Sequence, residues 1–416
     1  MPKPINLSAE DANKPELLNY EVNSIFALEY EVVARCGPKA RVGKLKLPHH
    51  IANTPIFMPV GTQGTVKGLS SKQLEDLGCE IILGNTYHLG LRPGPEILEH
   101  AGGLHNFMNW KRNILTDSGG FQMVSLLDLA DITEEGVTFQ SPHDGSQMLL
   151  TPEQSMSIQN NIGADIMMAL DDVVSTVSTD MERFEEATWR TLRWIDRCIK
   201  SHKRPQNQNL FGIVQGGLDE RLRLICLDGL IKRNLPGYAI GGLSGGEEKD
   251  KFWRTVSLCT DYLPDNKPRY CMGVGYPEDL VVCSALGVDM FDCVYPSRTA
   301  RFGTALVADG GTMKVKSNAY RTDFGPLDPQ LESSCMVDEC YSRSFLHNLC
   351  KVEQTGSQLV TYHNIAFQMN LMKNVRESII NGTFEKFVKD FMFNYFPKQK
   401  YPQWIVNALG SVGINL

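Results

Sequence analysis

Short apolar runs that end in polar or glycine-bearing loops recur eight times between residues 54 and 300, and this rhythm limits the possible folds more than any other feature. The runs are residues 56–59, 81–83, 114–116, 166–170, 210–214, 238–240, 270–272 and 288–291. Most are separated by segments that can form a helix, such as 182–202 and 220–233. Eight strand–helix units over roughly 250 residues match the size of a (β/α)8 TIM barrel. A doubly wound open sheet would give a similar rhythm, so the pattern favours the barrel and leaves the open sheet as the alternative.

Polar residues and glycines follow these runs at the places where a barrel carries its chemistry, the loops after the strands. Six of them lie at or just beyond the predicted strand ends: Asp117, Asp171, Gln215, Gly242, Gly273 and Asp292. Each has an ordinary explanation, because Asp often caps a helix and Gly permits a tight turn. That explanation weakens when the same placement recurs after five successive strands and after the third.

The remaining segments predict one compact domain with insertions. Residues 304–315 (TALVADGGTMKV) read as a hairpin with glycines in the turn, and an amphipathic segment at 365–394 reads as the delayed last barrel helix. The predicted divisions are an N-terminal extension with lead-in strands at 1–53, the barrel with its catalytic loops at 54–303, a hairpin and Cys-containing insertion at 304–362, and the last helix with the C-terminal segment at 363–416.

Composition excludes several classes of protein. Hydrophobic residues make up 42% of the 416 residues, which is enough core to argue against a disordered chain. The net charge of −7 argues against nucleic-acid binding through bulk positive charge but leaves room for a local basic patch. Eleven scattered cysteines favour a reducing compartment, and we find neither an apolar run of membrane-spanning length nor a signal-like N-terminus. The expected location is the cytoplasm.

Two aspartates have the arrangement that substitution at a sugar carbon needs. Asp292 ends the eighth run and Asp117 follows the third, and in a barrel their loops can face each other across the mouth. One carboxylate can attack C1′ to form a glycosyl-enzyme while the other handles protons. Helix capping or simple solvation is the alternative for both residues.

Other residues describe a pocket for a purine base. Asp171 can accept hydrogen bonds from the N–H and the amine of a guanine edge. Gln215 and the backbone near Gly242 can donate to the carbonyl of the same ring. Phe121 and Met272 offer a flat face and a thioether to sandwich it, although ordinary core packing also explains them.

A local excess of basic residues lies just beyond Asp292. Between residues 297 and 321, one acid, Asp309, stands against five basic residues: Arg298, Arg301, Lys314, Lys316 and Arg321. Such a stretch can hold phosphates or read a base edge, although a charge run is more often only a solvated face.

Taken together, these segments resemble the queuine tRNA-ribosyltransferases, also called tRNA-guanine transglycosylases, and most closely the eukaryotic catalytic subunits of that family. The matching motifs between about residues 35 and 305 are FMPVGTQGTVKG, GNTYHLGLRPG, LTDSGGFQM, TPEQSMSIQN, FGIVQGG, YAIGGLSGGE, MGVGYPEDLV and MFDCVYPSRTARFG. The resemblance implies a TIM barrel that exchanges guanine at the wobble position of tRNAs with GUN anticodons, those for aspartate, asparagine, histidine and tyrosine, for queuine through a covalent Asp–ribose intermediate.

The resemblance also implies residue roles. Asp292 matches the nucleophile and Asp117 the residue that transfers protons. The implied base-binding residues are Ser118, Gly119, Gly120, Phe121, Asp171, Gln215 and Gly242, and the predicted substrate-binding set also includes Gly245 and Met272. The implied RNA-binding residues are Gly273, Val274, Gly275, Tyr276, Pro277, Glu278, Asp279, Ser297, Arg298, Thr299, Ala300 and Arg301.

Gly245 bears on the choice of substrate. Bacterial relatives that insert a smaller precursor base carry a bulkier residue at this position. A glycine in the LSGGE segment is expected to leave space for the cyclopentenediol of queuine. The expected incoming base is therefore queuine.

The expected cofactor is a structural zinc, although the motif for it is incomplete. The family holds zinc with C-x-C-x2-C and a later His, whereas this chain has SSCMVDECYSRSFLH and a later His363. One register places Ser333, Cys335 and Asp338 at the three Cys positions, and a two-residue shift places Cys335, Val337 and Cys340 there. The expected ligands are Cys335, Cys340 and His363, with Asp338 or Cys350 as a fourth. A subdomain that folds without zinc is the alternative.

The expected partners are tRNA, queuine and, by resemblance, an accessory subunit in a heterodimer, with peripheral association at the mitochondrial outer membrane. The main alternative is that the chain is itself the non-catalytic accessory subunit. Loss of the catalytic aspartates would mark such a subunit, and this chain keeps both. An archaeal-type enzyme with extra C-terminal RNA-binding domains is less consistent, because only about 110 residues follow the barrel motifs.

Overall fold

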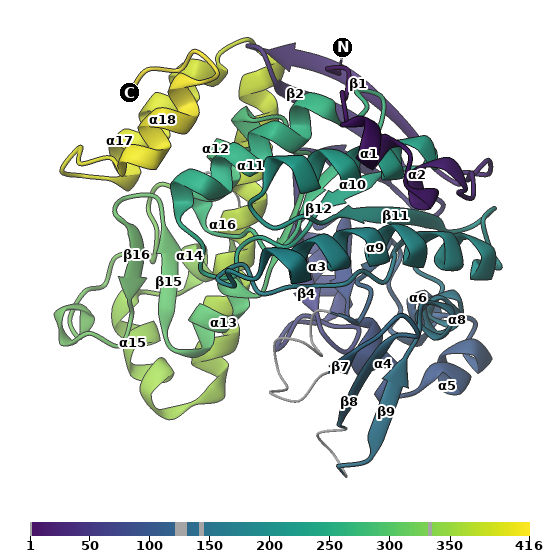
Figure 1. Cartoon of the computed structure of the whole chain (residues 1–416). Coiled ribbons are helices and arrows are strands. Elements are labelled where there is room, and N and C mark those ends of the chain that lie inside the picture. Colours follow the sequence, from purple (N-terminus) through teal and green to yellow (C-terminus); the bar gives the residue numbers. More distant parts are fainter. Residues whose placement is uncertain (1, 121–130, 141–144, 332–334) are drawn as a thin grey trace.

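Eight parallel strands close into a barrel at the centre of the molecule (Figure 1). The computed structural model describes the chain except for residues 1, 121–130, 141–144 and 332–334. The barrel strands are β4 (Ile56–Gly61), β5 (Ile81–Gly84), β6 (Asn113–Thr116), β10 (Ile166–Met168), β11 (Asn209–Val214), β12 (Tyr238–Ile240), β13 (Arg269–Cys271) and β14 (Met290–Cys293). β14 pairs with β4 in parallel, with Met290 opposite Ile56, and this pair closes the ring. The barrel prediction is confirmed and the open sheet is excluded.

Alternation along the strands fills both faces of the barrel wall. Ile56 and Met58 belong to the cluster inside the barrel, whereas Phe57 between them packs in the cluster under the helices. Ile81 and Ile82 divide in the same way. Because both faces are buried, the strands are continuous apolar runs, and this is why the sequence reveals them.

Helices cover the outside of the barrel (Figure 1). They are α3 (Ser71–Asp76), α4 (Thr86–Leu91), α5 (Pro95–His100), α6 (Leu104–Phe107), α8 (Pro152–Ile162), α9 (Met181–Ser201), α10 (Glu220–Lys232), α11 (Lys249–Tyr262), α12 (Pro277–Ala285), α13 (Tyr295–Arg301) and α16 (Gln354–Ile380). The side chains of Asp180 and Asp219 accept backbone N–H groups at the starts of α9 and α10. Both helices agree with their predicted ranges to within one residue. Among the described helices, none is both long and apolar enough to cross a membrane.

An antiparallel sheet precedes the barrel. Two short helices, α1 (Ala9–Ala12) and α2 (Pro15–Leu18), lead into its strands β1 (Glu29–Cys36), β2 (Ala40–Lys46) and β3 (Ile51–Thr54). The buried guanidinium of Arg41 on β2 donates to both carboxylate oxygens of Asp289, at 2.9 and 2.5 Å. Tyr30 on β1 donates to the same carboxylate at 2.8 Å. Asp289 directly precedes β14, so this ion pair fixes the sheet to the N-terminal end of the barrel.

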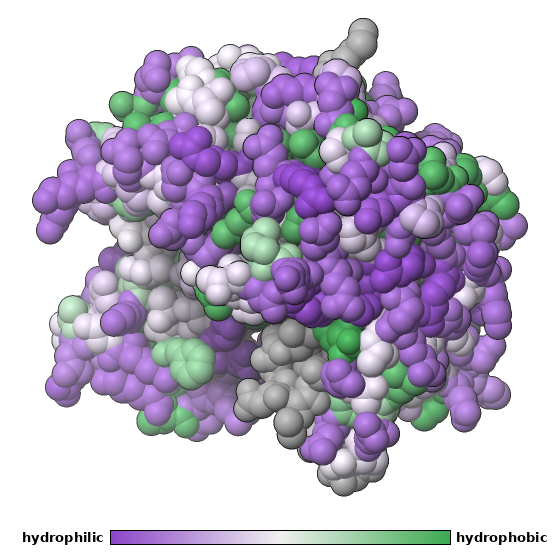
Figure 2. Space-filling view, viewed as in Figure 1, coloured by the Kyte–Doolittle hydropathy of each residue, from purple (hydrophilic) through white to green (hydrophobic). Residues whose placement is uncertain are grey.

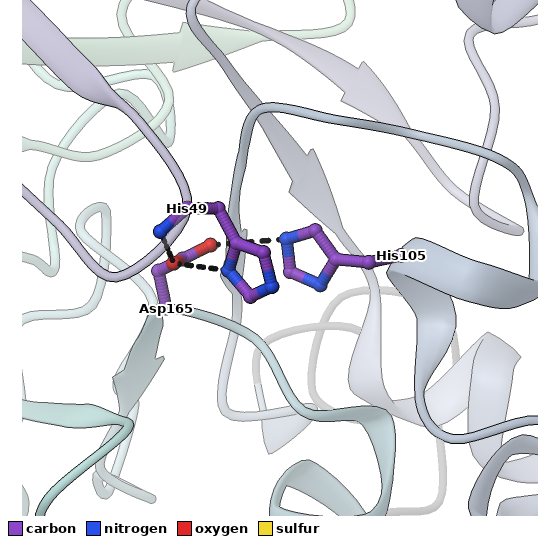
Figure 3. A group of neighbouring side chains, drawn as sticks. All are labelled: His49, His105 and Asp165. Carbon is purple, nitrogen blue, oxygen red and sulfur yellow. Dashed lines mark hydrogen bonds and ion pairs between the residues drawn. The ribbon is translucent and has the colours of Figure 1, made fainter.

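A second polar cluster ties elements together just before β10 (Figure 3). The buried carboxylate of Asp165 accepts hydrogen bonds from His49 Nδ1 at 2.7 Å and His105 Nε2 at 3.1 Å. It also accepts the backbone N–H groups of His49 at 3.2 Å and Ile114 at 2.8 Å. The two imidazoles stack with centroids 3.6 Å apart. Four hydrogen bonds satisfy this carboxylate, which joins the loop before β3 to α6, β6 and β10.

Two insertions interrupt the barrel pattern. A three-stranded sheet of β7 (Asp131–Ile132), β8 (Val137–Gln140) and β9 (Gln147–Leu150) stands between β6 and α8, and the sequence did not reveal it. The predicted hairpin is confirmed as β15 (Thr304–Val307) and β16 (Gly311–Lys314). It is followed by η1 (Asn318–Tyr320), α14 (Met336–Cys340) and α15 (Arg343–Val352).

The last barrel helix differs from its prediction in its bounds. α16 begins at Gln354, eleven residues before the expected start of 365, and ends at Ile380. Gly382, with φ +69°, breaks the helix, and α17 (Phe384–Tyr395) and α18 (Gln403–Gly410) follow. The predicted single helix at 365–394 is therefore two helices.

Candidate active site

Asp292 sits at the end of β14 with its carboxylate held from one side. The buried phenol of Tyr270 donates to Oδ1 at 2.6 Å, and the backbone N–H of Gly273 donates to the same oxygen at 2.8 Å. Among the described residues, no donor reaches Oδ2. Burial raises the pKa of Asp292, although these two hydrogen bonds oppose the shift. One oxygen is thus fixed and the other is available to react.

Asp117 directly follows β6, and its buried carboxylate accepts hydrogen bonds from a different set of donors. Its carboxylate accepts Asn85 Nδ2 at 2.6 Å, the Thr86 N–H at 2.9 Å and the Gly119 N–H at 3.2 Å. The loop between β5 and α4 therefore fixes its orientation. Burial, the charge and hydrogen bond of Asp292, and the charge of Asp117 together hold the pKa of Tyr270 well above its usual range. Both carboxylates thus act on one phenol, as expected for loops that share the barrel mouth.

Asp171, Ser118 and Gln215 form a connected polar group. Ser118 Oγ donates to Asp171 Oδ1 at 3.3 Å, and Gln215 Nε2 donates to Oδ2 at 2.6 Å. All three side chains are buried. Burial raises the pKa of Asp171 to about 6, against the opposing hydrogen bond from Gln215. The structure therefore brings together three predicted base-binding side chains from three different strand ends.

Two glycines near this group are explained by close packing. At Gly242, where φ is +62°, a Cβ atom would lie 2.4 Å from Gln215 Oε1, so only glycine lets the amide reach its place. At Gly241 a Cβ would lie 3.6 Å from Met272 Sδ. The thioether of Met272, predicted to contact the base, therefore lies beside the loop that carries Gly241 and Gly242. Gly119 and Gly120 continue from Asp117, whereas Phe121 lies outside the described residues.

The surroundings of Gly245 include a threonine hydroxyl. A Cβ at this position would lie 2.6 Å from Oγ1 of Thr176. The glycine therefore lets this hydroxyl lie against it, and the space for a queuine substituent stays a prediction. Thr176 belongs to the loop between β10 and α9, which also carries Asp171.

The predicted RNA-binding stretch after β13 divides into exposed and buried residues. Gly273 and Tyr276 are exposed, and the Tyr276 ring packs on Tyr295 with centroids 4.3 Å apart. Glu278 is half-buried. The side chains or backbone of the other four are buried: Val274, Gly275, Pro277 and Asp279. Asp279 forms an ion pair with Lys249 at 2.5 Å. The buried residues of the stretch therefore support the loop, and Tyr276 is the side chain that the loop exposes to solvent.

Helix α13 presents basic side chains to solvent. Ser297 and Ala300 are buried, Thr299 is half-buried, and Arg298 and Arg301 are exposed. We use the name basic surface for the two exposed arginines together with three exposed basic side chains at the end of the hairpin and after it: Arg298, Arg301, Lys314, Lys316 and Arg321. Within the described part of the chain, none of these five has an ion-pair partner. In the view of Figure 2, much of the surface is hydrophilic and hydrophobic residues are scattered.

Comparison with known proteins identifies the family. A family model described as queuine tRNA-ribosyltransferase matches residues 36–397. The chain belongs to the queuine tRNA-ribosyltransferase family. It is 56% identical to the queuine tRNA-ribosyltransferase catalytic subunit of Schizosaccharomyces pombe, covering 95% of this chain and 99% of the relative. It is 50% identical to the catalytic subunit of Caenorhabditis elegans, covering 94% of this chain and 100% of the relative. It is 48% identical to a queuine tRNA-ribosyltransferase of Bacillus thuringiensis, covering 89% of this chain and 97% of the relative.

Metal-ligand residues also gather where the queuine tRNA-ribosyltransferase motif for zinc falls. The ligand atoms of Cys335, Asp338 and His363 lie within 4.8 Å of one another. His363 Nδ1 is 2.7 Å from Asp338 Oδ2, and its Nε2 donates to the Leu306 carbonyl at 2.7 Å. A histidine that binds a metal through one ring nitrogen usually donates the N–H of its other ring nitrogen to a carbonyl or carboxylate, as His363 Nε2 does here. A ligand set of one sulfur, one nitrogen and one oxygen atom suits zinc.

The position of Cys340 corrects the predicted ligand set. Its side chain is exposed and lies outside this group. α14 turns Cys340 to the surface, while Asp338, two residues earlier, faces His363. The residues therefore follow the register of Ser333, Cys335 and Asp338, of which Ser333 is outside the described residues.

Sequence reasoning missed three residues that hold the two candidate catalytic aspartates in place. Asn85 and Thr86 directly follow β5, so the strand-end rule applied to the second strand would have found them. Tyr270 lies within β13 and looks like any other core aromatic. No pattern in the sequence indicates that the Tyr270 hydroxyl donates a hydrogen bond to Asp292.

Proposed function

We propose that this chain replaces guanine at the wobble position of tRNAs with GUN anticodons by queuine, with Asp292 as the nucleophile. The observation that carries the proposal is the one-sided hydrogen bonding of Asp292. Tyr270 and Gly273 hold Oδ1, while Oδ2 has no donor among the described residues. A carboxylate held in this way keeps one oxygen directed and unshielded for attack on a sugar carbon.

In the first step, Asp292 Oδ2 bonds to ribose C1′ and the bond from C1′ to guanine N9 breaks. The electron pair of that bond stays on guanine, which gains a proton through Asp117. In the second step, N9–H of queuine gives a proton to Asp117, and N9 attacks C1′. The ester to Asp292 breaks, and its electron pair returns to the carboxylate. Guanine takes up one proton in the first step and queuine gives one up in the second, so the protons balance, with Asp117 as the group that carries them.

The base would be recognised by the polar group of Asp171 and its neighbours. The carboxylate can accept the ring N–H and the exocyclic amine of guanine or queuine, and Gln215 can donate to the ring carbonyl. Without a base, Gln215 and Ser118 occupy those acceptor sites on Asp171. Binding of the base therefore replaces hydrogen bonds within the protein by hydrogen bonds to the base. The free energy of breaking the internal hydrogen bonds reduces the net affinity for the base.

The tRNA would be held by the basic surface and by Tyr276. Five exposed cations that pair with no described acid can neutralise phosphates despite the net charge of −7. The exposed ring of Tyr276, beside the catalytic loop, offers a stacking face to an unpaired base. The target nucleotide must leave its stack to reach Asp292.

We also propose that Cys335, Asp338 and His363 hold a structural zinc ion. The ion would join α14 to α16 beneath the hairpin and take no part in the chemistry. Metal analysis of the purified protein tests this directly. About one equivalent of zinc is expected, with loss in Asp338→Ala but not in Cys340→Ala, whereas under about half an equivalent would contradict it.

The names of two relatives, which call them catalytic subunits, support a further proposal: a heterodimer with an accessory subunit. We place the complex in the cytoplasm and, peripherally, at the mitochondrial outer membrane. Size measurement of the chain alone and with the accessory subunit tests the assembly. Fractionation of cells tests the location.

The test of the proposed activity is exchange of labelled guanine or queuine into a tRNA with guanosine at the wobble position. Wild-type protein should label this tRNA and should leave a tRNA with adenosine there unlabelled. Asp292→Asn should bind tRNA yet exchange no base. Exchange at an undiminished rate by Asp292→Asn would remove the nucleophile from the account.

A further inference from the structure

Thr176 carries a buried hydroxyl for which the described residues provide no partner. The residue is 8% exposed, and its Oγ1 has no hydrogen bond to any described residue. Buried hydroxyls are nearly always paired, because an unpaired one loses its water without compensation. A partner from outside the described residues is therefore to be expected, and a bound base can supply one.

The position of this hydroxyl relates it to the incoming base. It lies in the loop after β10 that begins with Asp171, and it faces Gly245 in the loop after β12 that begins at Gly241. Both loops carry predicted base-binding residues at their strand ends. Thr176 and Gly245 lie several residues farther along each loop, beyond the residues predicted to hold the base.

The glycine side of this contact is held rigidly. Glu247 accepts the backbone N–H groups of Ser244 at 2.6 Å and Gly245 at 2.9 Å, and Ser244 adopts φ +61°. A Cβ on Gly245 would come within 2.6 Å of the Thr176 hydroxyl, a distance that real Cβ contacts do not reach. Glycine at 245 is thus needed for the hydroxyl to keep its place.

We propose that Thr176 is a specificity-determining residue, whose Oγ1 hydrogen-bonds the hydroxylated substituent of the incoming 7-deazaguanine. This inference rests on the proposed function. Queuine bears a cyclopentenediol, which can both donate to and accept from a threonine hydroxyl. Guanine has no such group, so the contact would select the incoming base over the outgoing one.

The test compares three bases on three enzymes. Guanine, queuine and the 7-aminomethyl analogue without a diol are assayed with wild type, Thr176→Val and Thr176→Ser. Thr176→Val keeps the shape and removes the hydroxyl, and should raise KM for queuine about 3- to 10-fold, as loss of one hydrogen bond does. KM for guanine and for the aminomethyl base should change less than about twofold, and Thr176→Ser should resemble wild type.

Gly245→Ala supplies an independent variant if Thr176→Val folds poorly. Its methyl group would displace the hydroxyl and should give the same selective loss for queuine. Equal changes for all three bases, or an unchanged KM for queuine in both variants, would overturn the inference. If wild-type protein exchanges no base at all, it is the proposed function that fails.

Discussion

At the scale of single residues, the site depends on how each carboxylate is held. Asp292 receives both of its hydrogen bonds on one oxygen, whereas the donors of Asp117 are spread over both oxygens. Asp171 is bonded to neighbours that a base would replace. Three aspartates at or just beyond the ends of barrel strands therefore have three different environments, and the environment assigns the role.

Tyr270→Phe should slow the attack by Asp292. The variant removes the 2.6 Å hydrogen bond to Oδ1 and leaves the one from Gly273. One such bond is worth about 1–1.5 kcal/mol, so kcat should fall roughly tenfold while KM for tRNA stays the same. Because the lost bond favoured the ionised carboxylate, the defect should be larger at low pH.

The control for this variant is Tyr238→Phe. Tyr238 is also a buried tyrosine on a barrel strand, β12, but its hydroxyl is near Leu235 instead of the aspartates. If Tyr270→Phe and Tyr238→Phe had the same pH profile and the same kcat, the phenol would have no role in orienting Asp292.

Binding of guanine should weaken as the pH falls through about 6. Burial raises the pKa of Asp171 to about 6, and the neutral acid that forms below this value can no longer accept two hydrogen bonds. The cleanest measurement is calorimetric titration of guanine into Asp292→Asn, since burial also raises the pKa of Asp292. The affinity should be constant above pH 7 and fall about tenfold per unit below pH 6. A constant affinity from pH 5 to 8 would remove Asp171 from base recognition.

At the scale of elements, the barrel strands were predictable, whereas the sheet of β7, β8 and β9 and the start of one helix were not. Most barrel strands end at or next to a glycine or polar residue, because both faces are buried and chemistry begins where the strand ends. The first turns of α16 were not predicted, because the buried residues before position 365 include the polar Thr361, His363 and Asn364. Asn364 donates to the carbonyls of Pro296 and Thr304, and Gln368 donates to that of Gly275. A buried face with such polar residues produces no hydrophobic periodicity.

Helix α13 leads to a prediction about tRNA. Arg298→Ala and Arg301→Ala should each raise KM for tRNA several-fold and reduce the slope of log affinity against log salt by about 1. Guanine affinity should not change. Lys386→Ala on α17, another highly exposed cation, is the control and should leave the slope unaltered. If the arginine variants match this control, the basic surface does not bind phosphates.

At the scale of the whole molecule, polar ties fix the N-terminal end of the barrel and the reactive groups gather at the other. Asp289 joins the lead-in sheet to β14, and Asp165 with its stacked histidines joins four elements (Figure 3). The order of strands and the positions of Asp117, Asp171 and Asp292 could be predicted from the sequence. The hydroxyls of Tyr270 and Thr176 could not, because their roles depend on which distant residues they face.

The central claim is a covalent bond between Asp292 and ribose C1′, and the most direct measurement is trapping of that intermediate. Enzyme mixed with tRNA and no free base, then denatured, should migrate as a protein–RNA adduct, and mass spectrometry should place the ribose on the peptide that contains Asp292. Adding guanine or queuine before denaturation should remove the adduct, and Asp292→Asn should form none. An adduct on another residue, or undiminished base exchange by Asp292→Asn, would contradict the account.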